Sequence, residues 1–178
     1  MADIRSPRPV VMLIAVSSRY EHALDWAAQR AQAEFGPIEL RSLAFEFNQT
    51  EYYQASMGTE LKKQFLALRK LMDPGQLRHL KRMTNAWEME YAEQTDWPEE
   101  RPLNLDPGYL SEAKLVLAST KDHAHRIYLD DGIYAEVTLH YQGGCWQKSA
   151  WTYPDYQQAD FQEFFVSCRG FLRSELRK

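Results

Sequence analysis

The chain has 178 residues, of which 44% are hydrophobic, 26% charged and 13% aromatic, and its formal net charge is −4. This composition predicts one globular domain over residues 1–178, and the negative charge argues against a general nucleic-acid or anionic-membrane partner. Cys145 and Cys168 are too few and too far apart for a disulfide framework or a Cys-rich zinc site. The first residues contain no signal-peptide core and no apolar run reaches membrane-spanning length, so we expect a cytoplasmic protein.

The N-terminal part predicts a strand, a helix and a second strand. The apolar run VVMLIAV at 10–16 is typical of a buried strand. Apolar residues at helical spacing follow it as far as Gly36 and Pro37, which end the helix. The alternation in IELRSLAFEF predicts a strand at 38–47, and a polar, tyrosine-rich loop follows at 48–58.

The segment from Leu61 to Met72 fits both a helix and a strand. Leu61, Phe65, Leu68 and Met72 have helical spacing, while a strand pattern fits only moderately. We favour the strand, because DPGQ at 73–76 has the cap and first-turn residues that begin a new helix. That helix extends to about residue 91.

The next strand is supplied by PLNLDPGYL at 102–110 or by KLVLAST at 114–120. The order is then β-α-β-β-α-β, that of a ferredoxin-like sandwich with helices on one face of an antiparallel sheet. Strand signals continue until Asp160, where a terminal helix begins. We therefore predict the α+β class, with a ferredoxin-like start, a C-terminal β-hairpin region and a terminal helix.

The hairpin signal LDDGI at 129–133 decides which side chains share a face of the sheet. A two-residue loop at Asp131 and Gly132 would place Ile127 opposite Glu136. A three-residue loop pairs Ile127 with Ala135 and separates apolar from polar residues, so we choose it. The predicted inward set is Ile127, Leu129, Ile133, Ala135, Val137 and Leu139, and the outward set is Arg126, Tyr128, Tyr134, Glu136, Thr138 and His140.

The outward face allows two interpretations. An Arg126–Glu136 pair flanked by tyrosines is common on solvated sheets, but the same groups form a ligand floor if another element covers them. His125 falls on the inward side, which predicts a hydrogen-bonded core histidine. His123 and His125 have the spacing of a metal chelate, but no carboxylate is fixed near them and we predict no metal site.

Charge is distributed unevenly along the chain. Residues 62–82 contain seven basic side chains and one acidic one, whereas residues 93–112 contain six acidic side chains and one arginine. We interpret the basic stretch as a charged helix face rather than an RNA- or phosphate-binding patch.

Two loops are predicted beside the hairpin. The DPG sequence at 106–108 is typical of a tight turn, which would place Asp106 and Tyr109 at one end of the sheet, near Lys114. The aromatic loop WTYPDY at 151–156 either closes the edge of the core or covers an opening. We favour closure of the core.

Several enzyme motifs are absent from the sequence. It contains no GxxxxGK[ST] phosphate loop, no GxGxxG turn, no HExxH and no GxSxG elbow. These absences argue against P-loop NTPases, Rossmann dehydrogenases and zincins. None of the five histidines begins an H-x-[ST] motif, which excludes two-histidine RNA phosphoesterases.

The motifs FGPI, NLDPGYL, KLVLASTKDHAHRIYL, DGIYAEVTL and WTYPDY resemble those of a bacterial family catalogued as domain of unknown function 4416. The resemblance spans nearly the whole chain, and its segment at 104–139 is specific. It implies a single-domain bacterial protein. It carries no activity, substrate or catalytic residue to this chain.

The residues favour a small anionic, phosphate-bearing ligand. Phosphate requires positive charge together with several donors, and Lys121 and Arg126 lie near the hydroxyls of Ser119 and Thr120. The sequence leaves both enzymatic activity and the identity of any cofactor open. The expected ligand contacts are Lys121, Arg126, Lys114, Tyr109, Tyr153 and Tyr156, and the candidate acid or base groups are Glu136, Asp106 and His123.

The alternative is a non-catalytic interaction module whose tyrosine and tryptophan surface docks another protein or a second copy of the chain. Convergence of Lys121, Arg126, Asp106 and Tyr153 around one concavity would favour the ligand site. Scattering of these residues over a flat face would favour the interaction module.

Overall fold

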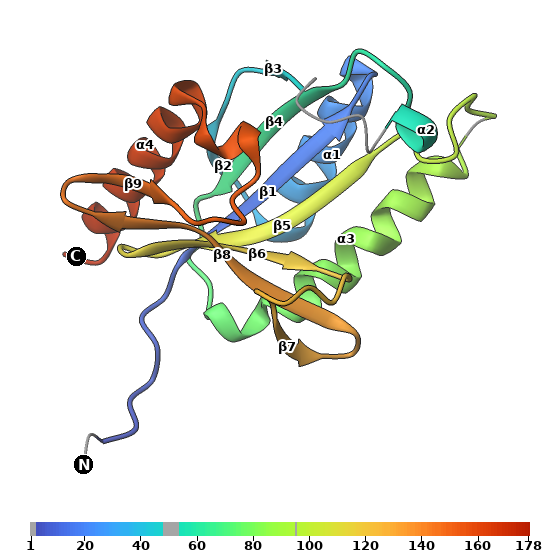
Figure 1. The fold of residues 1–178 in the computed structure, drawn as a ribbon. Helices are drawn as coiled ribbons and strands as arrows, with labels where there is room; N and C mark the ends of the chain where they lie inside the picture. Colours follow the sequence, from blue (N-terminus) through green and yellow to red (C-terminus); the bar gives the residue numbers. More distant parts are fainter. Residues whose placement is uncertain (1–2, 48–53, 95) are drawn as a thin grey trace.

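The computed structural model describes residues 3–47, 54–94 and 96–178. This part of the chain forms a single large sheet with helices on both faces (Figure 1). Its elements, in chain order, are β1 (Val11–Ser18), α1 (Glu21–Phe35), β2 (Ile38–Arg41), β3 (Phe45–Glu46), α2 (Gln54–Met57), β4 (Lys62–Leu68), the 3₁₀ turn η1 (Pro74–Gln76), α3 (Leu77–Ala92), β5 (Asn104–Leu110), β6 (Lys114–Ser119), β7 (Ile127–Asp130), β8 (Ile133–Gln142), β9 (Cys145–Lys148), the 3₁₀ turn η2 (Pro154–Gln157) and α4 (Ala159–Glu175).

The predicted α+β class is confirmed. The strand order is β2-β4-β1-β5-β6-β8-β7, and neighbouring strands are antiparallel. Strands β2, β4, β1 and β5, with α1 and α3, reproduce the ferredoxin-like start. The predicted strand at 38–47 is divided into β2 and β3, which pair with successive parts of β4.

The ambiguous segment from Leu61 to Met72 contains a strand rather than a helix, as predicted, and this strand is β4 (Lys62–Leu68). The helix signal after it is also confirmed, since the Asp73 carboxylate accepts a hydrogen bond from the Gly75 amide at 2.7 Å. Of the predicted loop at 48–58, residues 54–57 form α2, and residues 48–53 lie outside the described part of the chain.

Both faces of the central strands are covered. All eight residues of β1 are buried, which explains why its sequence is a continuous apolar run rather than an alternating one. Met12, Ile14 and Val16 pack with α1 and α3, while Val11, Leu13 and Ala15 pack with α4 on the other face. Helix α4 therefore adds a third layer to the ferredoxin-like start (Figure 1).

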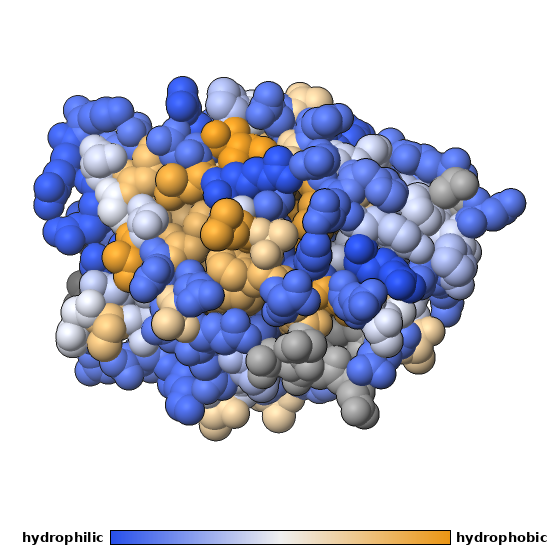
Figure 2. All heavy atoms as spheres, turned by 90° about the horizontal axis from the view of Figure 1, so that it is seen from above, coloured by the Kyte–Doolittle hydropathy of each residue, from blue (hydrophilic) through white to orange (hydrophobic). Residues whose placement is uncertain are grey.

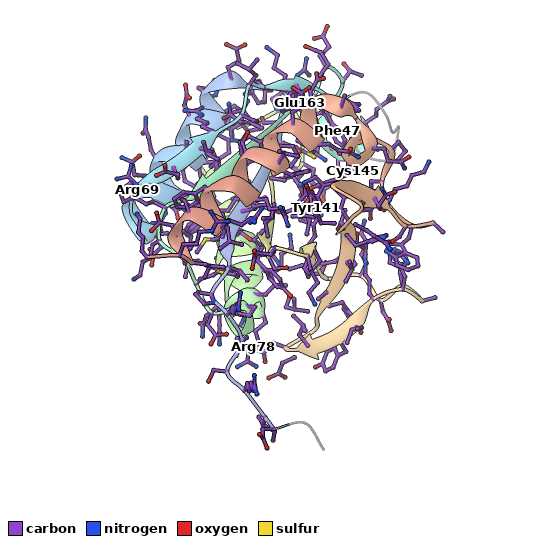
Figure 3. All side chains as sticks on the ribbon, turned by 90° about the vertical axis from the view of Figure 1, so that its left-hand side faces the viewer. Phe47, Arg69, Arg78, Tyr141, Cys145 and Glu163 are labelled. Atoms are coloured by element: carbon purple, nitrogen blue, oxygen red, sulfur yellow. The ribbon has the colours of Figure 1, made fainter. Side chains whose placement is uncertain are left out.

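Helix α4 packs through the apolar stripe that its sequence predicts. Phe161, Phe165, Cys168 and Leu172 are fully buried against the sheet. Arg169 stacks on the ring of Tyr141, 3.7 Å from its centroid, where β8 passes beneath the helix (Figure 3). Seen from above, hydrophobic residues gather near the centre of the visible face and hydrophilic residues surround them (Figure 2). No described helix is long and apolar enough to cross a membrane.

The tight turn predicted at 106–108 is wrong, because these residues lie inside β5. Strand β5 pairs with β1 along its whole length, but β6 pairs only with Gly108 to Leu110. Pro107, which has no amide hydrogen, therefore precedes the ladder to β6. A Cβ atom on Gly108 would lie 2.4 Å from the Val116 carbonyl oxygen. The glycine of the DPG sequence therefore reflects the close approach of β6 rather than a turn.

The predicted hairpin register is confirmed in part. Ile127 pairs with Ala135 and Tyr128 with Tyr134, as predicted. The three-residue loop is wrong: Asp130 pairs with Ile133, so the loop is Asp131 and Gly132, and Leu129 forms a bulge. Both loop residues have positive φ, 52° and 74°, which is typical of the tight type I′ turn.

The predicted faces of the hairpin are confirmed only in part: Ile133 and Leu139 are buried as predicted, but other positions differ. Ile127 is 71% exposed because β7 is the last strand of the sheet, whereas Glu136 and Thr138 are buried. Segment 151–156 covers the side of β8 that carries Glu136: Trp151 Nε1 donates to the Val137 carbonyl and Thr152 Oγ1 to that of Thr138. The Arg126–Glu136 face is therefore covered rather than solvated.

Candidate functional site

A cavity of about 350 Å³ lies at one end of the sheet, where β1 and β6 end and β4 and β5 begin. Its floor is formed by residues of β4, β5 and β6 and by Glu136 of β8. Segment 153–156 forms one wall, and Phe47, which lies beside the start of α4 (Figure 3), lines it as well. This volume suits a small molecule of metabolite size.

The first buried ion pair of the cavity joins Lys63 of β4 to Asp155 of η2. The Lys63 ammonium donates to the Asp155 carboxylate, and the two side chains are 7% and 4% exposed. The same ammonium lies 3.8 Å from the centroid of the Phe47 ring and 5.2 Å from that of Tyr156. Aromatic faces attract cations, so these rings add to the stabilisation of a buried charge.

The second ion pair joins the buried Lys81 of α3 to the half-buried Asp106 of β5. Lys81 Nζ donates to the Leu105 carbonyl at 2.8 Å and to Asp106 Oδ1 at 3.0 Å. Asn104 Nδ2 donates to the second oxygen of Asp106 at 2.8 Å. The Asp106 side chain is 28% exposed, so its carboxylate faces the cavity while its partners are buried.

The charge of Asp106 is fixed by its neighbours. Burial alone would raise the pKa of Asp106, but the charge of Lys81, the hydrogen bond from Asn104 and the charge of Lys63 lower it from 3.8 to about 2. A general base is most effective with a pKa near the working pH, so Asp106 is a poor base at neutral pH. It is instead a permanent hydrogen-bond acceptor.

The third buried ion pair joins Arg126 to Glu136. Arg126 Nε donates to Glu136 Oε2 at 2.8 Å, and the two side chains are 2% and 1% exposed. Arg126 also donates to Ser119 Oγ, the Lys121 carbonyl and the Tyr153 hydroxyl. The guanidinium thus uses four of its five N–H groups to hold together the walls of the cavity.

The core position predicted for His125 is wrong. His125 lies in the turn before β7, on the same side as Arg126, and its Nε2 is 3.2 Å from Glu136 Oε2. Its ring stacks between Trp151 and His123. His125 and Arg126 lie in the turn before β7 rather than in the strand, so the alternation of faces along a strand does not apply to them. No described group of three or more His, Cys, Asp or Glu side chains is placed to hold a metal ion.

A fourth ion pair supports the cavity from behind. Arg101 lines the cavity and donates to Glu88 Oε2 of α3 at 2.8 Å. The other oxygen of Glu88 accepts a 2.6 Å hydrogen bond from the Leu105 amide. Burial raises the pKa of Glu88, and the charges of Lys81 and Arg101 offset this rise only in part. Glu88 therefore anchors the start of β5, which carries Asp106.

Seven of the nine predicted site residues line this cavity. They are Asp106, Lys121, His123, Arg126, Glu136, Tyr153 and Tyr156. The other two lie elsewhere: Lys114 is exposed at the start of β6, and Tyr109 packs on the α3 face with Leu77. The four residues chosen to distinguish a ligand site from a flat surface, Lys121, Arg126, Asp106 and Tyr153, converge on one concavity.

Sequence reasoning missed Lys63, Lys81 and Asp155. The basic stretch at 62–82 is not one helix face, because it spans β4, η1 and the start of α3, and two of its lysines are buried. A signal for Lys81 exists in the sequence: it falls between Leu77 and Thr84 on the apolar stripe of its helix. No comparable signal marks Asp155.

The preferred interpretation of the WTYPDY loop was incomplete. Tyr156 is buried in the core cluster beneath α4, which agrees with closure of the core. Tyr153, Pro154, Asp155 and Tyr156 also line the cavity, so the same segment covers an opening.

The family model described as domain of unknown function DUF4416 matches residues 8–171. The chain belongs to this family. No curated protein and no solved structure matches the chain. The DUF4416 match covers all described strands and all described residues that line the cavity, so the site as described lies inside the family domain.

The low pKa of Asp106 predicts a defined pH dependence in this DUF4416 chain. A carboxyl group with a folded-state pKa of about 2 and an ordinary value of 3.8 contributes about 2 kcal/mol of stability above pH 4, which is lost as the pH falls from 4 to 2. Asp106→Asn removes this contribution. In urea unfolding, we expect the stability gap between parent and variant to shrink by about that amount over this range. A gap that stays constant would contradict the pKa assignment.

Proposed function

We propose that the cavity binds a small anionic ligand, and that a phosphate group is its best match. The observation that carries this proposal is the convergence of three buried cations, Lys63, Lys81 and Arg126, on one cavity. They come from β4, from α3 and from the turn before β7, so three separate parts of the chain deliver charge to the same place.

Stability alone does not account for this arrangement. Removing a charged pair from water costs free energy that its mutual attraction often fails to recover, and apolar replacements of such pairs are often neutral or stabilising. Buried charges that gather in a cleft are typical of functional sites. The buried ion pairs therefore favour a binding role for this end of the sheet.

The composition of the cavity matches an anion. Its described lining includes five basic side chains and three carboxylates, and one of the basic residues, Arg101, is also paired with Glu88 behind the wall. The hydroxyls of Ser119, Thr120 and Tyr153 lie at the same end. Phosphate oxygens accept several hydrogen bonds at once, which suits a ring of ammonium and hydroxyl donors.

The proposal is tested by comparing two matched double variants. Lys63→Met/Asp155→Leu removes the cavity pair as a unit and leaves no unpaired charge. Arg69→Met/Glu39→Leu removes an exposed ion pair at the opposite end of β4 and serves as the control. Inorganic phosphate and pyrophosphate are titrated by calorimetry, and melting temperatures are measured with and without each anion.

We expect both anions to raise the melting temperature of the parent and of the control, since a ligand that binds only the folded state stabilises it. The cavity variant should bind at least about tenfold more weakly, because charge-assisted hydrogen bonds are lost. Failure of every anion to bind the parent, or equal binding by the cavity variant, would overturn the proposal.

A second candidate function is docking of another protein at β7. Ile127, Tyr128 and Leu129 are 71%, 55% and 41% exposed on this edge strand, and Trp151 nearby is 42% exposed. Edge strands with exposed apolar residues are natural sites for strand addition. The ligand proposal is preferred because it accounts for the buried charges, which strand docking leaves unexplained.

We also propose that the protein works in a reducing compartment such as the cytoplasm. Both cysteines are free thiols, and Cys145 is exposed. Exposed free thiols are typical of proteins kept reduced. We also propose that the protein is bacterial, as the resemblance of its sequence motifs implies.

A further inference from the structure

The three described carboxylates of the cavity differ in their access to a ligand. The side chains of Glu136 and Asp155 are 1% and 4% exposed and are enclosed by their own cations. The Asp106 side chain is 28% exposed. Among the described lining residues, Asp106 is therefore the carboxylate that a bound molecule can touch.

Asp106 retains unused capacity as an acceptor. Its Oδ1 accepts from Lys81 and its Oδ2 from Asn104. A carboxylate offers about four lone-pair sites, so two remain for a ligand. Because Lys81, Asn104 and Lys63 hold the group in its charged form, it has no proton to donate.

An accessible, permanent acceptor is unfavourable beside a bare anion. A phosphate group placed against Asp106 would meet like charge, which weakens binding. The same carboxylate becomes favourable when the ligand presents a hydroxyl donor to it, since hydrogen bonds to a charged acceptor are among the stronger ones. Sites built around such an acceptor discriminate against ligands that lack the matching donor.

We infer that the ligand is a hydroxylated phosphate ester whose hydroxyl groups donate to Asp106 while its phosphate contacts the cationic groups of the cavity. This inference rests on the proposed function and adds the chemical class of the ligand. Free sugar phosphates and the ribose phosphate of a mononucleotide share this chemistry. A cavity of about 350 Å³ has room for a molecule of either kind.

The test compares ligands first on the unaltered protein, so that folding is not in question. Methyl phosphate, a phosphate ester without hydroxyls, is titrated alongside ribose 5-phosphate and adenosine 5′-monophosphate. We expect ribose 5-phosphate to bind at least about tenfold more tightly than methyl phosphate, the gain typical of hydrogen bonds to a charged acceptor. Tighter binding of the nucleotide than of ribose 5-phosphate would identify a mononucleotide as the source, and weaker binding a free sugar phosphate.

Asp106→Asn supplies the matching protein-side measurement. The variant keeps the size of the side chain and removes its charge, so we expect it to lose about tenfold in affinity for ribose 5-phosphate. Its affinity for methyl phosphate should stay constant or rise, because a repelling charge is gone. Weaker binding of methyl phosphate by the variant, together with unchanged binding of ribose 5-phosphate, would overturn the inference.

The two proposals fail in different ways. Equal binding of methyl phosphate and ribose 5-phosphate to the unaltered protein would overturn the hydroxylated class and leave the anion site intact. Absence of binding by all three ligands and by inorganic phosphate would overturn the anion site itself.

Discussion

Replacing Glu136 with alanine is expected to lower the free energy of unfolding by about 3–5 kcal/mol. The substitution leaves the Arg126 guanidinium buried without its carboxylate, and both side chains are almost inaccessible to water. It also removes the hydrogen-bond partner of His125 and Thr138. Urea unfolding followed by circular dichroism measures the loss.

Two further variants separate charge burial from simple loss of a side chain. Arg126→Met/Glu136→Leu removes the pair together and should cost far less than Glu136→Ala, since no unpaired charge remains. Glu112→Ala breaks two exposed ion pairs, with Arg8 and with Arg173, and should cost less than about 1 kcal/mol. A double variant as unstable as Glu136→Ala would contradict this account of the ion pair.

Gly108→Ala is expected to destabilise the fold by about 3 kcal/mol, at the upper end of the usual cost of overpacking. A Cβ atom at this position would lie 2.4 Å from the Val116 carbonyl oxygen and 2.7 Å from Leu117 Cδ2. Leu117 can turn aside, but the oxygen belongs to the backbone of β6. Strands β5 and β6 must therefore separate, which weakens the ladder beside Asp106.

The control for this substitution is Gly170→Ala, on the exposed side of α4. A Cβ atom there meets nothing within 4 Å, and alanine favours a helix interior over glycine. The free energy of unfolding of this variant should rise by about 0.5–1 kcal/mol. Urea unfolding followed by circular dichroism measures both glycine variants. If both glycine variants changed the free energy of unfolding in the same way, the close approach of β6 to Gly108 would not explain the requirement for this glycine.

Most helices and strands could be predicted because their signals are local. The strand at β1, the stripe of α4 and the helix start at Asp73 each follow from residues within a few positions of one another. The segment from Leu61 to Met72 was ambiguous by periodicity alone, and the helix signal directly after it resolved the choice correctly.

The faces of the hairpin could be predicted only in part, because two bulges intervene. Leu129 is an extra residue in β7, and Thr138 is an extra residue in β8 opposite β6. Each bulge shifts the alternation by one residue, so an apolar and polar pattern projected along the strand assigns later residues to the wrong face. Leu139 therefore packs under α4 while Ile133 packs on the α3 side.

The candidate site was predicted where a local motif marked its residues, as for Asp106, Tyr153 and Tyr156, and was missed where no local motif did. Ser119 to Glu136 form one connected region, so the involvement of Arg126 and Glu136 could be inferred from it. Lys63 and Asp155 are 92 positions apart, and nothing in either local sequence marks the pair.

By itself, the sequence determined the α+β class, the ferredoxin-like order of the first strands and the concentration of polar groups before and within β8. Hydrophobic periodicity and turn chemistry act over a few residues, so they can be recognised without coordinates. Only the tertiary structure decided that Lys63, Lys81 and Arg126 lose contact with water around one cavity. Burial depends on which distant segments pack over a side chain, and here segment 151–156 encloses charges that an uncovered sheet would have left in solvent.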